Sequence, residues 1–154
     1  MGGPESGPRW RPAVSLVLDS SATLAWVYSD EITTAIGEVF ARLNERGAWV
    51  PALWRLEVAN VLQMGVRRGR HDAAFRDAAL TDLGLLPISV DPDTGRHAWN
   101  ATLHLAERHK LTVYDAAYLE LAQRRGLPLA TLDADLRVAA SAERVVLLGC
   151  PPAP

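Results

Sequence analysis

The stretch "VSLVLD" (residues 14–19) decides the fold of this chain. Its first five residues form an apolar run of the length of a fully buried strand, and Asp19 ends it. The helical segment "SATLAWVYSD" (21–30) follows almost at once. A buried strand that leads directly into a helix is typical of α/β domains with a mainly parallel sheet. In such sheets, sites collect at the carboxyl ends of strands, which is the position of Asp19.

The rest of the chain repeats this alternation of strand and helix. Further apolar, strand-like runs cover residues 48–51, 86–90, 127–133 and 144–149. Helical patterns cover residues 32–45, 51–70, 72–83, 93–109, 112–125 and 134–141. We therefore predict an α/β domain whose mainly parallel central sheet, of about five strands, is flanked by helices on both faces.

Length and composition indicate a single globular domain. The chain has 154 residues, 49% apolar and 22% charged, which suffices for a genuine hydrophobic core. The folded unit is expected to span residues 13–149. Residues 1–12, rich in Gly and Pro, read as a flexible N-terminal arm, and residues 150–154 as a C-terminal tail. The net charge of −2 provides no general basic field that would indicate a nucleic-acid partner.

Cysteine content and hydropathy bear on the compartment. Cys150 is the single cysteine, which excludes an internal disulfide and a cysteine-based zinc site and favours a reducing environment. No segment approaches the roughly 18 apolar residues of a membrane span, and the first residues lack the apolar core of a signal peptide. We expect a cytoplasmic protein with no membrane partner.

A carboxylate lies on the apolar side of the predicted helix 51–70. In "PALWRLEVANVL" (51–62), winding at about 100° per residue places Glu57 within the arc expected to face the core. That arc contains Leu53, Trp54, Leu56, Val58, Val61 and Met64. Glu57 is expected beyond the first turn, where the helix dipole would no longer favour an acid. Because an unpaired buried charge is costly, Glu57 requires either an arginine partner or a bound cation.

Three aspartates each admit a structural and a functional explanation. Asp19 and Asp133 both end an apolar run and precede a helix, so each fits a helix N-cap as well as a site at the strand ends. Thr112 and Asp115 have capping-box spacing, yet winding of helix 112–125 also turns Asp115 inward. Asp135 fits either role as well. Taken singly, these residues leave both explanations open.

Taken together, Asp19, Glu57, Asp115 and Asp133 predict a metal site. If the four carboxylates converge, their mutual repulsion requires cations, and hard divalent ions prefer carboxylate oxygens. An all-acid pocket without His or Cys favours Mg²⁺ or Mn²⁺ over zinc. Such ions engage phosphates and lower the pKa of a coordinated water. The chemistry expected is hydrolysis of a phosphodiester.

Several segments, in this order and spacing, resemble the PIN-domain family, in particular bacterial VapC-type toxins of toxin–antitoxin pairs. They are "VLDSSATLAWVYSDE" (17–31), "PALWRLEVANVL" (51–62), "LTVYDAAYLELAQRRGLPLATLDADL" (111–136) and the closing apolar strand. The resemblance covers residues 14–148. It implies a Mg²⁺- or Mn²⁺-dependent endoribonuclease that acts on single-stranded regions of RNA.

The resemblance also implies roles for individual residues. Asp19 and Asp115 would be the most direct metal ligands, and Glu57 and Asp133 would complete the cluster directly or through bound waters. The residues that would support this pocket by hydrogen bonding are Ser20, Asn60 and Thr131. Because each acid of the quartet is present, an active enzyme is expected.

Partners follow from the same resemblance. Family members form homodimers and are blocked by a cognate antitoxin, whose tail lies in a groove of the toxin and covers the acidic site. Trp26, Val27 and Tyr28 would contribute to that groove, with ordinary core packing as the alternative.

Other protein classes fit the sequence less well. A haloacid-dehalogenase-like phosphatase needs a second Asp two residues after the first, where this chain has Ser21. A receiver domain needs a lysine at the end of a late strand, but Lys110 precedes a helix. Neither glycine-rich nucleotide-binding motif occurs. The remaining rival is a PIN-like module that binds RNA or protein without cutting.

Overall fold

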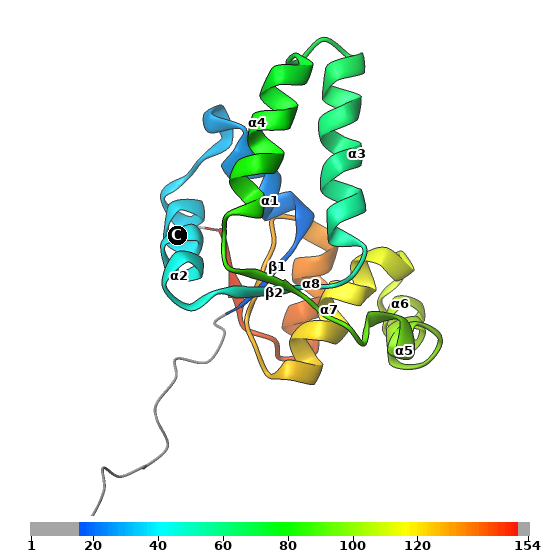
Figure 1. Ribbon diagram of the computed structural model, residues 1–154. Helices are drawn as coiled ribbons and strands as arrows, with labels where there is room; N and C mark the ends of the chain where they lie inside the picture. The colour runs from blue at the N-terminus through cyan, green and yellow to red at the C-terminus, as the bar shows by residue number, and fades with distance from the viewer. Residues whose placement is uncertain (1–15, 151–154) are drawn as a thin grey trace, which may run out of the picture.

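A five-stranded, all-parallel sheet forms the centre of the computed structural model, which describes residues 16–150 (Figure 1). The strands are β1 (Leu16–Leu18), β2 (Ala48–Val50), β3 (Ile88–Val90), β4 (Leu129–Ala130) and β5 (Leu147–Leu148). Their order in the sheet is β3-β2-β1-β4-β5, and each neighbouring pair is parallel. The predicted α/β architecture with a parallel central sheet is therefore confirmed.

Helices connect successive strands. They are α1 (Ser20–Val27), α2 (Thr34–Arg46), α3 (Trp54–Arg67), α4 (Ala73–Gly84), α5 (Thr94–His97), α6 (Leu103–His109), α7 (Val113–Arg125) and α8 (Ala134–Ala142), with the short turns η1 (Ser29–Glu31) and η2 (Ala98–Thr102). Gly47 and Gly126 end α2 and α7 at positive φ, a backbone conformation that glycine adopts without a steric penalty. In Figure 1, α3 and α4 stand side by side and extend well beyond the sheet.

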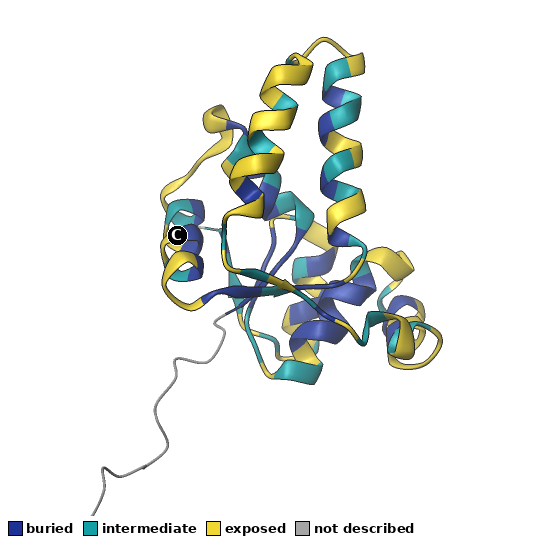
Figure 2. Ribbon diagram, in the orientation of Figure 1, coloured by how far each residue is buried: buried dark blue, intermediate teal, exposed yellow. Residues whose placement is uncertain are grey.

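The core is concentrated around β1 and α7. Every residue of β1 is fully buried, as expected for the central strand, and α7 packs against it. Seven consecutive residues of α7, Ala116–Ala122, are buried. Helix α4 is the opposite case, with Leu83 as its one buried residue (Figure 2). The sheet and α7 are therefore the rigid platform, while α4 leaves apolar surface open to solvent.

The structure corrects the predicted start and inner face of the helix 51–70. Helix α3 begins at Trp54 rather than at Pro51, so Glu57 lies in its first turn and not beyond it. The buried positions are Trp54, Val58, Leu62 and Gly65. Leu56, predicted to face the core, is 76% exposed, and Val61 is also exposed. The face is narrower than predicted because α3 is covered mainly by α1 and α4.

The predicted helix 93–109 is also subdivided, because a π-helical turn separates α5 from α6. The predicted arm at residues 1–12, the first residues of the predicted β1 run and the tail beyond Cys150 lie outside the described residues. Among residues 16–150, none of the helices is long and apolar enough to cross a membrane.

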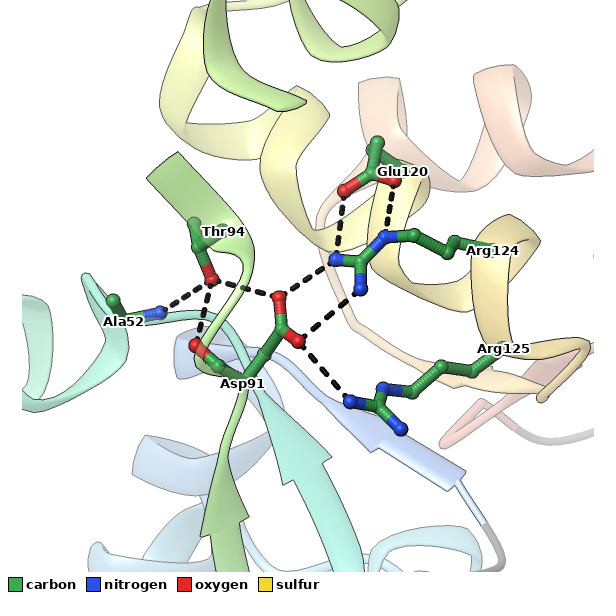
Figure 3. Close-up of polar contacts among 6 residues, drawn as sticks. All are labelled: Ala52, Asp91, Thr94, Glu120, Arg124 and Arg125. Atoms are coloured by element: carbon green, nitrogen blue, oxygen red, sulfur yellow. Dashed lines mark hydrogen bonds and ion pairs between the residues drawn. The ribbon is translucent and has the colours of Figure 1, made fainter. Parts of the chain in front are cut away.

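A buried ion-pair network centred on Asp91 joins the carboxyl end of β3 to α7 (Figure 3). The fully buried Asp91 carboxylate accepts hydrogen bonds from Arg124 at 2.6 and 3.2 Å and from Arg125 at 3.2 Å. The Thr94 hydroxyl donates to the same carboxylate at 3.0 Å and accepts a hydrogen bond from the backbone N–H of Ala52. The network therefore ties the chain ahead of α3 and the start of α5 to the last turn of α7.

Candidate active site

Asp19 lies at the carboxyl end of β1, where the sequence predicted a site. It is buried, and it caps α1 by accepting a hydrogen bond at Oδ1 from the backbone N–H of Ala22 (2.9 Å). The Ser21 hydroxyl donates to the same oxygen at 2.7 Å. Oδ2 accepts a hydrogen bond from the Thr131 hydroxyl at 2.5 Å. Asp19 is therefore an N-cap through Oδ1, as one explanation predicted, while Oδ2 faces Thr131 at the end of β4.

Burial raises the pKa of Asp19 to about 6, against the opposing effect of its three hydrogen bonds. The negative charge of Asp133 raises it further. Burial and the nearby charge of Asp133 both disfavour the ionised form of Asp19, and no ion pair in residues 16–150 compensates them. A bound metal ion would offset this electrostatic cost.

Thr131, directly after β4, couples Asp19 to Asp133. The fully buried Thr131 hydroxyl donates to Asp19 and accepts a hydrogen bond from the backbone N–H of Asp133 at 3.0 Å. Asp133 in turn caps α8, accepting from the backbone N–H of Leu136 at 2.8 Å. Ser21 adds a second tie between the strand ends, because its hydroxyl accepts from the N–H of Leu132 at 2.9 Å. The ends of β1 and β4 therefore form one hydrogen-bonded unit.

Glu57 faces the site from the first turn of α3. The Tyr118 hydroxyl donates to its Oε1 at 2.5 Å. Burial raises the pKa of Glu57, the hydrogen bonds from Tyr118 and Ser20 lower it, and the charge of Asp115 raises it. The alternative of an arginine partner is not observed, because no ion pair within the described chain involves Glu57.

Asp115 lies in the first turn of α7. The capping box is present in part, since the backbone N–H of Asp115 donates to the Thr112 hydroxyl at 3.1 Å. Burial raises the pKa of the Asp115 carboxyl, and the negative charges of Asp133 and Asp135 add to that effect. Asp115 is thus the acid that is electrostatically coupled both to Glu57 on one side and to Asp133 on the other.

The four predicted acids are therefore brought to one region, from the ends of β1 and β4 and from the first turns of α3 and α7. None of them forms an ion pair with a basic side chain in residues 16–150. Across the same residues, no three His, Cys, Asp or Glu side chains stand close enough to form a ready-made metal cage. This arrangement fits Mg²⁺, which takes one or two carboxylates directly and keeps several waters.

The three predicted supporting residues are placed differently. Ser20 lies close enough to lower the pKa of both Glu57 and Tyr118, and Thr131 bridges two acids as described above. Asn60 is exposed and lines a separate hollow of about 230 Å³ together with Tyr28 and Arg70. Its supporting role stays a prediction. Sequence reasoning missed Ser21, which contacts both the nearby Asp19 and the distant Leu132, and Tyr118, whose partner Glu57 is 61 residues away.

An apolar groove lies between α1 and α4. It has a volume of about 340 Å³ and is lined by Trp26, Val27, Ile32, Phe75, Ala78, Ala79, Asp82, Leu83 and Leu86. Of the three predicted groove residues, Trp26 and Val27 line it. Tyr28 instead is buried, with its hydroxyl 2.9 Å from Nε2 of His71 and the Arg70 guanidinium 3.5 Å from its ring centre.

Solved structures with this arrangement of elements come from several organisms. PAE2754 from Pyrobaculum aerophilum is 26% identical, with a TM-score of 0.65 over 88% of this chain and 91% of that one. FitAcB from Neisseria gonorrhoeae (13% identity, TM-score 0.60, 86% and 95% covered) and Mycobacterium tuberculosis VapC20, a sarcin-ricin loop cleaving toxin (19%, 0.54, 81% and 95%), share the fold.

Sequence comparison gives the family. The chain is 32% identical over 124 residues to ribonuclease VapC3 of Mycobacterium tuberculosis, strains CDC 1551 / Oshkosh and ATCC 25618 / H37Rv, which covers 79% of this chain and 85% of the relative. The PIN-domain family model matches residues 16–142. Since that match includes each of the four acids and all but the last strand, the chain belongs to the PIN-domain family and is related to the VapC ribonucleases.

Proposed function

We propose that this protein is a Mg²⁺- or Mn²⁺-dependent endoribonuclease and the toxin of a toxin–antitoxin pair. The proposal is supported by the carboxyl groups of Asp19, Glu57, Asp115 and Asp133, which are electrostatically coupled in pairs and form no ion pair with a basic side chain in residues 16–150. A purely structural set of acids would be expected to pair with arginines, as Asp91 does in the same chain. RNA as the substrate is supported by the relatives named as ribonucleases.

In the proposed mechanism, Asp19 and Asp115 would bind the ion most directly, and Glu57 and Asp133 would complete the site directly or through water. When bound, the ion would supply polarisation of the phosphate and a water of lowered pKa. The protein's own part is to hold the ligands in place. Thr131 orients Asp19 from β4, in a contact that is buried and therefore well fixed.

The direct test is incubation of the purified protein with single-stranded RNA in the presence of Mg²⁺ or Mn²⁺. We expect cleavage that EDTA abolishes and that either ion restores. The rival proposal, a PIN-like module without catalysis, predicts RNA binding that persists in EDTA and no cleavage under either condition. Sequencing the RNA that is cut on induction in cells would identify the target.

Acidic pH is expected to stabilise the metal-free protein. The pKa of Asp19 is about 6 in the fold against an ordinary value of 3.8, so the folded state binds protons more strongly than the unfolded chain. The contribution of Asp19 to the free energy of unfolding is therefore fully present below about pH 4. It is lost as the pH rises through about 6, and the loss amounts to roughly 3 kcal/mol. The raised pKa values of Glu57 and Asp115 act in the same direction.

Denaturant unfolding at about pH 5 and pH 7 would measure this dependence. Addition of Mn²⁺ at pH 7 should restore the stability lost, because a cation bound to the folded state compensates the ionised acids. In Asp19→Asn the fall between the two pH values should be smaller. Unchanged or rising stability across this range without metal would contradict the electrostatic picture of the site.

We further propose that the apolar groove between α1 and α4 holds a segment of the cognate antitoxin and that the protein is a homodimer, as the VapC resemblance implies. A carboxylate placed in the groove would have to be desolvated by that segment. Ala78→Glu, at an exposed groove position, is therefore expected to weaken antitoxin binding by at least about tenfold.

Ala74→Glu is the matched control, because Ala74 is exposed on the same helix but does not line the groove. Binding would be measured by calorimetry with the protein encoded beside the toxin, and the oligomeric state by light scattering. Equal loss of affinity in both variants would place the antitoxin elsewhere.

A further inference from the structure

Tyr118 is a buried residue whose hydroxyl serves the acidic site rather than the core. Its side chain is only 1% exposed and sits on α7 among apolar residues. The hydroxyl donates to Oε1 of Glu57 at 2.5 Å, across 61 residues of sequence. Phenylalanine would fill the same volume, so the packing of α7 does not account for the hydroxyl.

Several acidic-site groups surround this hydroxyl. Glu57 is its hydrogen-bond partner, and Asp115 lies three residues earlier on the same helix. The phenol donates to the carboxylate, and its burial limits competition from water for this hydrogen bond. Tyr118 lies on α7 and Glu57 lies on α3, so this hydrogen bond joins two helices.

We propose that Tyr118 is a positioning residue that holds the Glu57 carboxylate in the orientation in which it contributes to metal binding. This inference rests on the proposed metal-dependent function. Asp115 and Tyr118 are three residues apart, so the same face of α7 carries one of the four acids and the hydroxyl that hydrogen bonds to another, Glu57. A glutamate has several rotatable bonds, and fixing it before the ion arrives lowers the entropic cost of binding.

Tyr118→Phe removes the hydroxyl alone and is the test. Hydrogen-bond partners of metal ligands typically contribute about 10- to 100-fold to metal affinity. We expect Mn²⁺ affinity, measured by electron paramagnetic resonance titration of free Mn²⁺, to fall by at least about tenfold. The kcat for RNA cleavage should fall while the KM for RNA changes little. The metal-free melting temperature should change by only a few degrees.

Two variants separate positioning from general structural damage. Tyr114→Phe is the matched control, because it is the same substitution on the same helix at a residue that is 65% exposed, and it should leave Mn²⁺ affinity unchanged. In a Glu57→Gln background, Tyr118→Phe should weaken Mn²⁺ binding much less than it does in the wild-type protein, because the Tyr118 hydroxyl acts through the Glu57 carboxylate.

Wild-type Mn²⁺ affinity in Tyr118→Phe would overturn the inference while leaving the proposed nuclease intact. A full additional loss in the Glu57→Gln background would also overturn it, because Tyr118 would then act by another route. A wild-type protein that neither binds Mn²⁺ nor cleaves RNA would instead overturn the proposed function itself.

Discussion

Asp19→Asn is expected to abolish metal-dependent RNA cleavage, with a loss of about 10³-fold or more, while the metal-free protein stays as stable as the wild type. Removing the charge removes a proposed direct ligand, and a bound metal ion would supply several kcal/mol of transition-state stabilisation. At about 1.4 kcal/mol for each factor of ten, losing the productive ion accounts for the size of the effect.

The stability part of this prediction follows from the contacts of Asp19. Asparagine is as good an N-cap as aspartate, so the bond from the N–H of Ala22 is retained. The Thr131 hydroxyl can accept as well as donate and can therefore face either side-chain atom of an asparagine. Loss of the charge also relieves the repulsion between residue 19 and Asp133. The melting temperature in EDTA should equal or exceed that of the wild type.

Asp72→Asn is the matched control for Asp19→Asn. Asp72 caps α4 in the same way, accepting from the N–H of Phe75 at 2.8 Å, but it is exposed and has no part in the acidic cluster. We expect full cleavage activity in this variant. Cleavage rates would be measured with a labelled single-stranded RNA, and an Asp19→Asn protein that cuts at the wild-type rate would remove Asp19 from the site.

Most of the fold could be predicted because the pattern of strands and helices is local. Each strand is a short apolar run, and a glycine directly follows the last residue of α2 and of α7. The inner face of α3 was predicted less well, because the pattern does not reveal that only a narrow stripe is covered by α1 and α4. Leu56 looks like a core residue in sequence but lies on the exposed side.

The four candidate acids could be singled out in the sequence because two of them end strands and two lie on helix faces predicted to turn inward, although the aspartates also had capping explanations. The hydrogen bonds that hold these acids could not be worked out from local patterns, because they join distant segments; Thr131 was expected only through the family resemblance, and Tyr118 was missed. The bond from Tyr118 to Glu57 spans 61 residues, and that from Thr131 to Asp19 spans 112. The same holds for Asp91, whose arginine partners lie 33 and 34 residues away on α7.

Asp91→Ala is expected to be the most destabilising single substitution outside the site, at about 3 kcal/mol or more of unfolding free energy. Burial by itself raises the pKa of Asp91, but hydrogen bonds from Arg124, Arg125 and Thr94 outweigh it and hold the pKa well below its usual range. Truncation would leave the guanidinium groups without their shared carboxylate. Arg124 would keep its bonds to Glu120, whereas Arg125 would keep only its stacking on Trp49.

Asp91→Asn distinguishes charge from shape at this position. It keeps the volume and much of the hydrogen bonding but removes the charge, so its loss of stability should lie between those of the wild type and Asp91→Ala. Because the pKa of Asp91 is lowered in the fold, its stabilising effect is present above the unfolded value of 3.8 and fades as the pH falls below it. The gap between wild type and Asp91→Ala should therefore narrow in acid.

Urea unfolding of the metal-free proteins at neutral pH would measure these differences, with Asp77→Ala as the exposed counterpart. Asp77 pairs with Arg76 at 2.9 Å, a distance comparable to those around Asp91, but its side chain is 66% exposed. Its removal should leave the unfolding free energy unchanged within error, because water replaces the partner. Similar losses in Asp77→Ala and Asp91→Ala would mean that burial does not set the strength of the Asp91 network.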